Sequence, residues 1–104
     1  MTEAGPPITV RVATLRPDRV EAYERLHREL PARAIELMRE DGFDLLDIHR
    51  VGLTLIMLLR APPGPLAART PEDVGFETRQ QMLTDECFAS PWRDSLPMFT
   101  LTTK

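Results

Sequence analysis

Two side chains that can exchange protons are spaced to meet on one face of a helix. Tyr23 and His27 lie four residues apart in a segment of helical periodicity, so their side chains lie one above the other. Histidine is the side chain best suited to donate or accept a proton near neutral pH. Because this face is also the apolar one, the two polar groups must find partners or line a cavity. The pair is a candidate acid–base site; the alternative is that both residues pack at the helix edge.

The second histidine stands on a predicted strand. His49 shares a strand face with Asp47 and Val51, and the sequence does not fix whether that face meets His27. Two histidines without a third ligand are a weak basis for a metal site, so no metal is expected. The single cysteine, Cys87, has no histidine beside it in the sequence, and we expect it to be a buried, small apolar side chain.

One aromatic residue and two arginines also bear on a ligand site. Trp92 is the only tryptophan, and such a residue near a loop either joins the core or stacks on a flat ligand. Arg11 and Arg60 lie on predicted strands, where each faces either a ligand cavity or a dimer partner. The sequence contains no glycine-rich phosphate loop and no nucleophile elbow.

Composition limits the class of protein. The chain has 104 residues, 42% of them apolar and 28% charged, which predicts one globular domain over residues 1–104 with a loose leader at 1–7. A net charge of −3 without a basic stripe argues against nucleic-acid binding. The longest apolar run, residues 53–59, is far shorter than the roughly 20 residues of a membrane span. The N-terminus shows no signal pattern, so we expect a cytoplasmic protein that binds neither membranes nor nucleic acid.

The first part of the chain predicts a strand and a broken helix. Residues 8–15 alternate, with Val10 and Val12 on the same face, as expected of a strand with one buried face. A helical period of three and four follows. Pro31 lies inside this period and predicts a break, and Gly42 is expected to end the second helix.

The remaining elements complete a familiar order. They are strands over residues 43–51 and 53–60 joined at Gly52, a helix over 70–88, a short helical turn at 90–92 and a strand over 98–103. The order strand–helix–strand–strand–helix–strand is the ferredoxin-like α+β pattern (βαββαβ), with four antiparallel strands and the helices on one face. We expect a homodimer that covers the other face, which the nearly continuous apolar run at 53–60 favours. The alternative is a monomer with a polar open face.

The proton-exchanging pair belongs to a longer pattern of residues. That pattern comprises Pro17-Asp18, Tyr23, His27, the helix-breaking Pro31, Gly42 before the next strand, and Thr84-Asp85-Glu86-Cys87. It resembles the L-rhamnose mutarotase family over about residues 8–95.

The resemblance implies a dimeric ferredoxin-like α/β barrel with a sugar bound between sheet and helices, and a role in carbohydrate metabolism. It implies that His27 is the general acid at the anomeric centre and that Tyr23 contacts the sugar. No cofactor is implied. Mutarotation needs a proton removed from the anomeric hydroxyl and one delivered to the ring oxygen, which a positioned acid–base group can supply. The resemblance therefore implies a deoxy-pyranose mutarotase.

The sequence departs from the family at positions that would contact the sugar. Leu46 stands where the family has a tyrosine, and of an adjacent tryptophan pair at most Trp92 remains. His49 is then the polar group available from the second strand. The candidate substrate-binding residues are Tyr23, Leu46, His49 and Trp92. The departures leave open a cyclase, isomerase or cofactor-free oxygenase on the same scaffold, acting on an apolar or polycyclic metabolite, or a non-catalytic small-molecule-binding protein.

Overall fold

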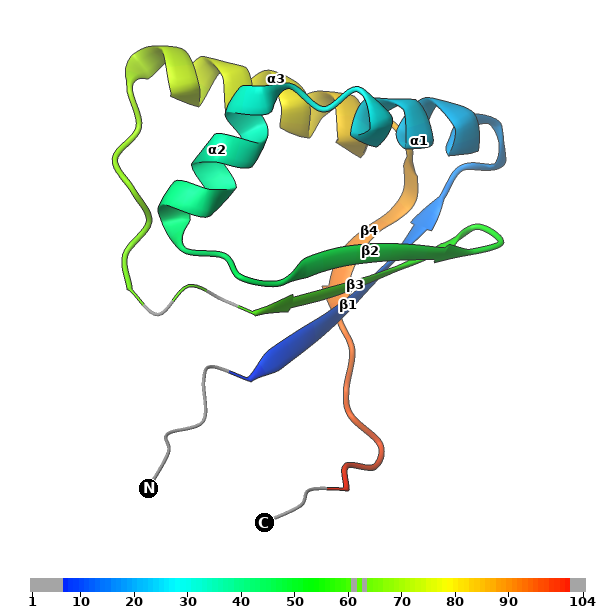
Figure 1. The fold of residues 1–104 in the computed structure, drawn as a ribbon. Coiled ribbons are helices and arrows are strands. Elements are labelled where there is room, and N and C mark those ends of the chain that lie inside the picture. The colour runs from blue at the N-terminus through cyan, green and yellow to red at the C-terminus, as the bar shows by residue number, and fades with distance from the viewer. Residues whose placement is uncertain (1–6, 61, 63, 102–104) are drawn as a thin grey trace, which may run out of the picture.

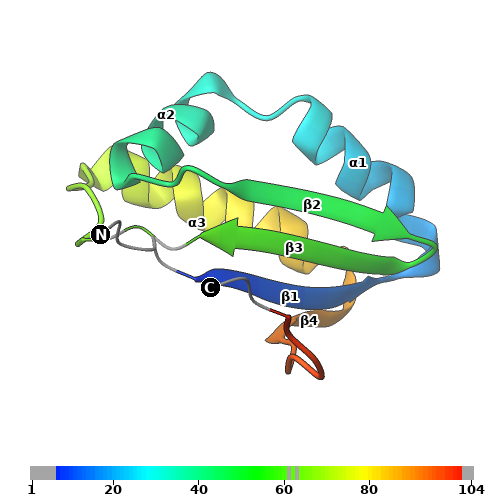
Figure 2. The same cartoon turned by 60° about the horizontal axis from the view of Figure 1, so that its bottom comes forward.

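The fold is one antiparallel sheet with all its helices on one face (Figures 1 and 2). The computed structural model describes residues 7–60, 62 and 64–101. The strands are β1 (Ile8–Leu15), β2 (Leu46–Val51), β3 (Thr54–Arg60) and β4 (Phe88–Asp94). They are ordered β2-β3-β1-β4, and every neighbouring pair is antiparallel. The predicted ferredoxin-like α+β fold is confirmed; of the predicted leader at 1–7, residues 1–6 lie outside the described residues.

Proline and glycine set the bounds of the first two helices. A short 3-10 turn over Pro17–Arg19 leads into α1 (Val20–Arg28). Pro31 is extended and lies immediately before α2 (Ala32–Asp41), and Gly42 follows α2 with a left-handed φ of 96°. Pro31 cannot continue a helix because it lacks an amide donor, whereas glycine adopts positive φ without strain. The predicted break at Pro31 and end at Gly42 are both confirmed.

The sheet has one face against the helices and one open face. Successive side chains of β1 point alternately to these two faces. Ala13 and Leu15 are fully buried on the helix side, whereas Val10 and Val12 lie on the open side. In register, Val10 pairs with Leu58 and Val12 pairs with Ile56. Both faces of the central strands are therefore apolar, and the sequence pattern alone does not identify the face that the helices cover.

The end of the chain differs from the prediction. α3 (Pro71–Asp85) ends earlier than expected, and the predicted helical turn at residues 90–92 is wrong, because this segment is part of β4. Pro91 fits a strand here since β4 is an edge strand, where a missing amide costs no ladder hydrogen bond. The predicted strand over 98–103 is also wrong for residues 98–101, which form no strand; residues 102–103 lie outside the described residues.

Two arginines tie the loop before α3 to the rest of the helical layer. Arg69 donates to both carboxylate oxygens of Asp41, at 2.8 and 2.7 Å, and also to Glu77 at 2.8 Å. Arg33 of α2 donates to both oxygens of Asp73, at 3.0 and 2.9 Å. These bidentate contacts cross from α2 to the start of α3 and hold the long connection in place.

Asp73 also begins α3. Its carboxylate accepts from the backbone amide of Thr70, and the Thr70 hydroxyl accepts from the backbone amide of Asp73, so the two form a capping box. Hydrogen bonds from Arg33 hold the pKa of the Asp73 carboxyl well below its usual range, and the cap reinforces this. Hydrogen bonds from Arg69 likewise lower the pKa of Asp41.

Acid should therefore weaken the fold. A carboxyl whose folded pKa is depressed stabilises the protein above its unfolded pKa of about 3.9, and that contribution is lost as the pH falls further. We expect Asp73→Asn to lower the free energy of unfolding near neutral pH, and its difference from the parent to narrow below about pH 4. Urea titrations at a series of pH values measure the free energy of unfolding of both proteins. Asp85→Asn, an exposed change on the same helix, is the control, and a pH-independent difference for Asp73→Asn would contradict the assignment.

Candidate functional site

A cavity lies between α1 and the helix-facing side of the sheet. One part has a volume of about 630 Å³, and the adjoining part has about 600 Å³. Four residues line both parts: Tyr23, His27, Leu46 and Ile48. Volumes of this size are typical of small-molecule sites.

Strand alternation decides which residues of β2 reach the cavity. Leu46, Ile48 and Arg50 line it, so the intervening Asp47 and His49 point to the open face. In register, His49 pairs with Ile56 of the open face. The structure thus brings Leu46 to the candidate site and does not bring His49 there.

A row of aromatic rings connects the cavity to the core. The ring centroids of Tyr23 and His27 are 4.5 Å apart, those of Tyr23 and Phe88 are 5.7 Å apart, and those of Phe88 and Trp92 are 5.9 Å apart. Trp92 is half-buried against the core and also lines the second part of the cavity. Trp92 therefore belongs to the core packing and also borders the cavity.

Tyr23 presents a protonated hydroxyl. Its residue is only 4% exposed, and burial raises the pKa of the phenol to about 12. The hydroxyl has no hydrogen-bond partner among the described residues. It is not counted among fully buried unpartnered atoms, because none is found in that part of the chain. Tyr23 lines both parts of the cavity, so its side chain can contact a ligand there.

His27 is held in one orientation by its own helix. Its Nδ1 lies 3.1 Å from the backbone carbonyl oxygen of Tyr23. A carbonyl oxygen only accepts, so Nδ1 carries the proton and donates it, which leaves Nε2 as the atom that exchanges protons. The side chain lies exposed at the cavity mouth. The arrangement can deliver a proton to, or take one from, a ligand that sits against Tyr23.

Sequence reasoning missed several residues that shape the cavity. The second part is also lined by Met57, Phe76 and Gln80, and by Arg11, which was already a candidate from the sequence. Arg11 had two open interpretations, and the structure places it at the cavity. Ile48 and Met57 could have been found from Leu46, because strand alternation and cross-strand pairing put them on the same face.

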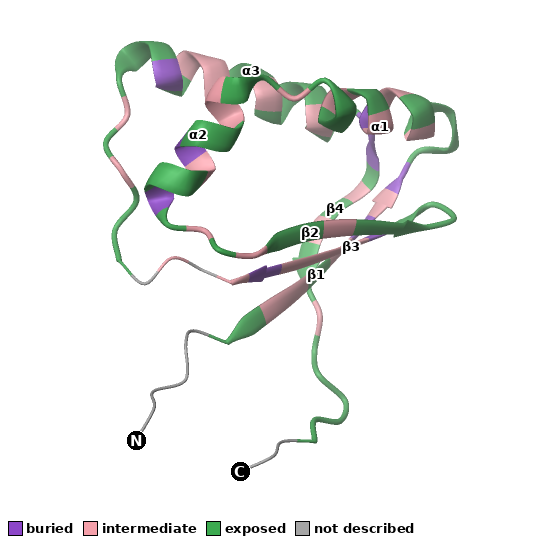
Figure 3. Cartoon of the chain, in the orientation of Figure 1, coloured by how far each residue is buried: buried purple, intermediate pink, exposed green. Residues whose placement is uncertain are grey.

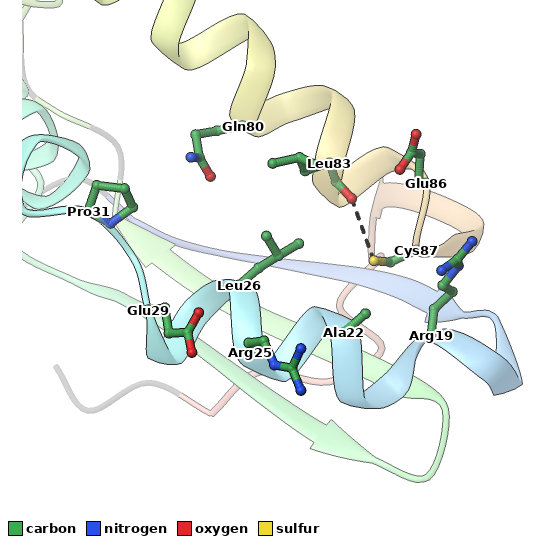
Figure 4. Close-up of a pocket in the computed structure, with 10 residues that line it drawn as sticks. All are labelled: Arg19, Ala22, Arg25, Leu26, Glu29, Pro31, Gln80, Leu83, Glu86 and Cys87. Atoms are coloured by element: carbon green, nitrogen blue, oxygen red, sulfur yellow. Dashed lines mark hydrogen bonds between the residues drawn. The ribbon is translucent and has the colours of Figure 1, made fainter.

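Cys87 lies beside a separate groove between α1 and α3 (Figure 4). Its thiol donates to the carbonyl of Leu83 at 3.6 Å, and burial raises its pKa. These features make it a packing residue, as expected, and a poor nucleophile.

Metal ligands are not clustered in the described part of the chain: no group of three or more His, Cys, Asp or Glu there could hold an ion. Among the same residues, no helix is long and apolar enough to cross a bilayer.

Comparison with known proteins gives structural neighbours but no sequence family. No family model matches this chain, and no curated protein matches it. The L-rhamnose mutarotase FA22100 from Formosa agariphila superposes with a TM-score of 0.67 at 10% identity, covering 92% of this chain and 99% of that one. A protein from Nitrosomonas europaea assigned as an antibiotic biosynthesis monooxygenase gives a TM-score of 0.51 at 16% identity, covering 88% and 98%. These likenesses show a shared fold.

The orientation of His27 makes a spectroscopic prediction. Neutral His27 should have its proton on Nδ1, because the Tyr23 carbonyl 3.1 Å away accepts it. Long-range ¹⁵N–¹H correlation spectra distinguish the two tautomers. His49, for which no such contact exists among the described residues, serves as the internal comparison. A protonated Nε2 on neutral His27 would be incompatible with this geometry.

Proposed function

We propose that this chain is a cofactor-free mutarotase that interconverts the anomers of a deoxy-pyranose resembling L-rhamnose. The observation that carries the proposal is the His27 imidazole, which is held through Nδ1 by the Tyr23 backbone carbonyl and lines the cavity together with Tyr23. The shared fold with a rhamnose mutarotase supports it.

The reaction needs only proton transfers. Cationic His27 donates its Nε2 proton to the ring oxygen while water removes the anomeric hydroxyl proton, so the bond between C1 and the ring oxygen breaks. The resulting aldehyde rotates about the C1–C2 bond. Closure reverses both transfers and returns the proton to Nε2, giving either anomer. Tyr23 donates a hydrogen bond to a sugar oxygen, since its raised pKa keeps it protonated.

Anomer exchange tests the proposal. NMR saturation transfer between the anomeric protons of L-rhamnose should show enhancement by the protein. His27→Gln should reduce that enhancement by roughly 10²-fold or more, the usual size of an acid–base contribution. His49→Gln, on the opposite face of the sheet, is the matched control and should retain it. Enhancement that survives in His27→Gln would remove the histidine from the mechanism.

A second function is favoured by the walls of the cavity. Leu46, Ile48, Met57 and Trp92 form an apolar wall on the sheet side, whereas most of the polar lining residues come from the helices. A flat apolar ring would pack on this wall more closely than a sugar would. If no deoxy-sugar shows enhanced exchange, the proposal moves to an apolar or polycyclic metabolite handled by a cyclase, isomerase or cofactor-free oxygenase. A protein that binds such a ligand without reaction is the remaining candidate.

We also propose that the chain acts as a cytoplasmic homodimer joined through the open face of the sheet. Val10, Val12, Ile56 and Leu58 form an apolar stripe there. Beyond β4, the chain continues on the side of the sheet away from the helices and is exposed (Figures 1 and 3). Its large apolar side chains are all more than three-quarters exposed in a single chain: Leu96, Met98, Phe99 and Leu101. Apolar surface of this extent is typical of a protein–protein interface.

Light scattering after size exclusion tests the dimer. The parent should have twice the chain mass of 11.8 kDa. Val12→Arg places a charge on the apolar stripe and should give a monomer, because a buried unpaired charge is strongly unfavourable. Val74→Arg, at a residue 52% exposed on α3, should leave the mass unchanged. A monomeric parent would exclude the interface.

A further inference from the structure

Arg11 enters the cavity from the centre of the sheet. It lies on β1, pairs in register with Met57 of β3 and Asp94 of β4, and is on the same face as Ala13. It lines the second part of the cavity together with Tyr23, His27 and Trp92. A guanidinium group is thus present in an otherwise largely apolar space.

The hydrogen bonds of Arg11 are incomplete. Its Nε donates to Asp94 at 3.1 Å, and its two terminal nitrogens make no hydrogen bond within the described residues. By contrast, Arg33 and Arg69 each use all three of their nitrogens on carboxylates or backbone carbonyls. Asp94 lies at the rim with 73% of its side chain exposed, whereas the Arg11 side chain is 46% exposed. The charge of Asp94 is therefore screened by water, and Arg11 keeps donors free for another acceptor.

The other charged group in this part of the cavity is already neutralised. Glu77 also lines it, but both of its carboxylate oxygens accept from Arg69, at 2.8 and 3.2 Å. Among the described residues that line this space, Arg11 is thus the permanently charged side chain that has donors to spare for a ligand, and His27 is the other group there that can carry a positive charge. A guanidinium fork with free donors matches a carboxylate, which it can bind through two hydrogen bonds.

We propose that Arg11 anchors a carboxylate of the ligand, so that the cavity takes the apolar metabolite of the second candidate function, in the form of a flat ring that carries an acidic group. The ring lies against Trp92 and Met57, and the carboxylate meets the terminal nitrogens of Arg11. This rests on the proposed function only in taking the cavity as the ligand site; it does not depend on the sugar reaction.

A matched pair of probes tests the charge requirement. 2-Naphthoate and 2-naphthamide have the same shape and differ in charge. We expect the naphthoate to bind at least about tenfold more tightly, equivalent to about 1.4 kcal/mol. The shift of the single indole N–H resonance, from Trp92, reports binding at this site and gives both dissociation constants.

Two substitutions test whether Arg11 causes the preference for 2-naphthoate over 2-naphthamide. Arg11→Gln should abolish the difference between the two probes, and Arg79→Gln, an exposed change on α3 outside the cavity lining, should preserve it. Arg11→Met keeps an apolar stem of similar length and replaces the glutamine variant if that one does not fold. In the parent, added salt should reduce the preference, because it screens the charge.

Several results would overturn the proposal. These are equal affinities for the two probes in the parent, a preference retained without Arg11, and no indole shift with either probe. Failure of the mutarotase proposal would look different, since anomer exchange would be absent while the naphthoate preference and its loss in Arg11→Gln persisted.

Discussion

The packing of Tyr23 between α1 and the sheet is the interaction on which the site depends. Its ring contacts Phe88 of β4 on one side and stacks near His27 on the other. In the core it is joined by Ala13, Leu15 and Leu55 from the central strands. This packing fixes the distance and rotation of α1 over the sheet. The shape of the cavity depends on it, because α1 and the sheet form two of the walls, while α2 and α3 line the second part.

The same packing also determines the protonation of the Tyr23 phenol. Burial of Tyr23 raises the pKa of the phenol to about 12, so the hydroxyl stays protonated near neutral pH. His27 needs no partner from another element, because its Nδ1 donates to a carbonyl one turn earlier in α1. Tyr23 and His27 are thus oriented by a single helix and by one aromatic contact to the core. The break at Pro31 falls after this pair and does not disturb the turn that holds it.

The sequence predicted the elements that have strong local signals. Alternation located β1, the helical period located α1, and Pro31 and Gly42 bounded α2. It failed for β4, where Ser90-Pro91 has the local pattern of a helix start but the place of Pro91 on a sheet edge makes it compatible with a strand. For the site, helical spacing predicted the meeting of Tyr23 and His27. The sequence could not separate His49 from them, because the face of β2 that meets the helices is set by the register of the hairpin through Gly52.

Strand alternation also explains how one strand serves two surfaces. In β1, Arg11 faces the cavity, whereas its neighbours Val10 and Val12 face the open side. A rigid central strand, paired on both edges, holds these opposite side chains in fixed relation. An interface on the open face would therefore restrain the strand that carries Arg11 without touching the ligand. The proposed interface and the proposed anchor would need no further element to be coupled, because Val10, Arg11 and Val12 are consecutive residues of β1.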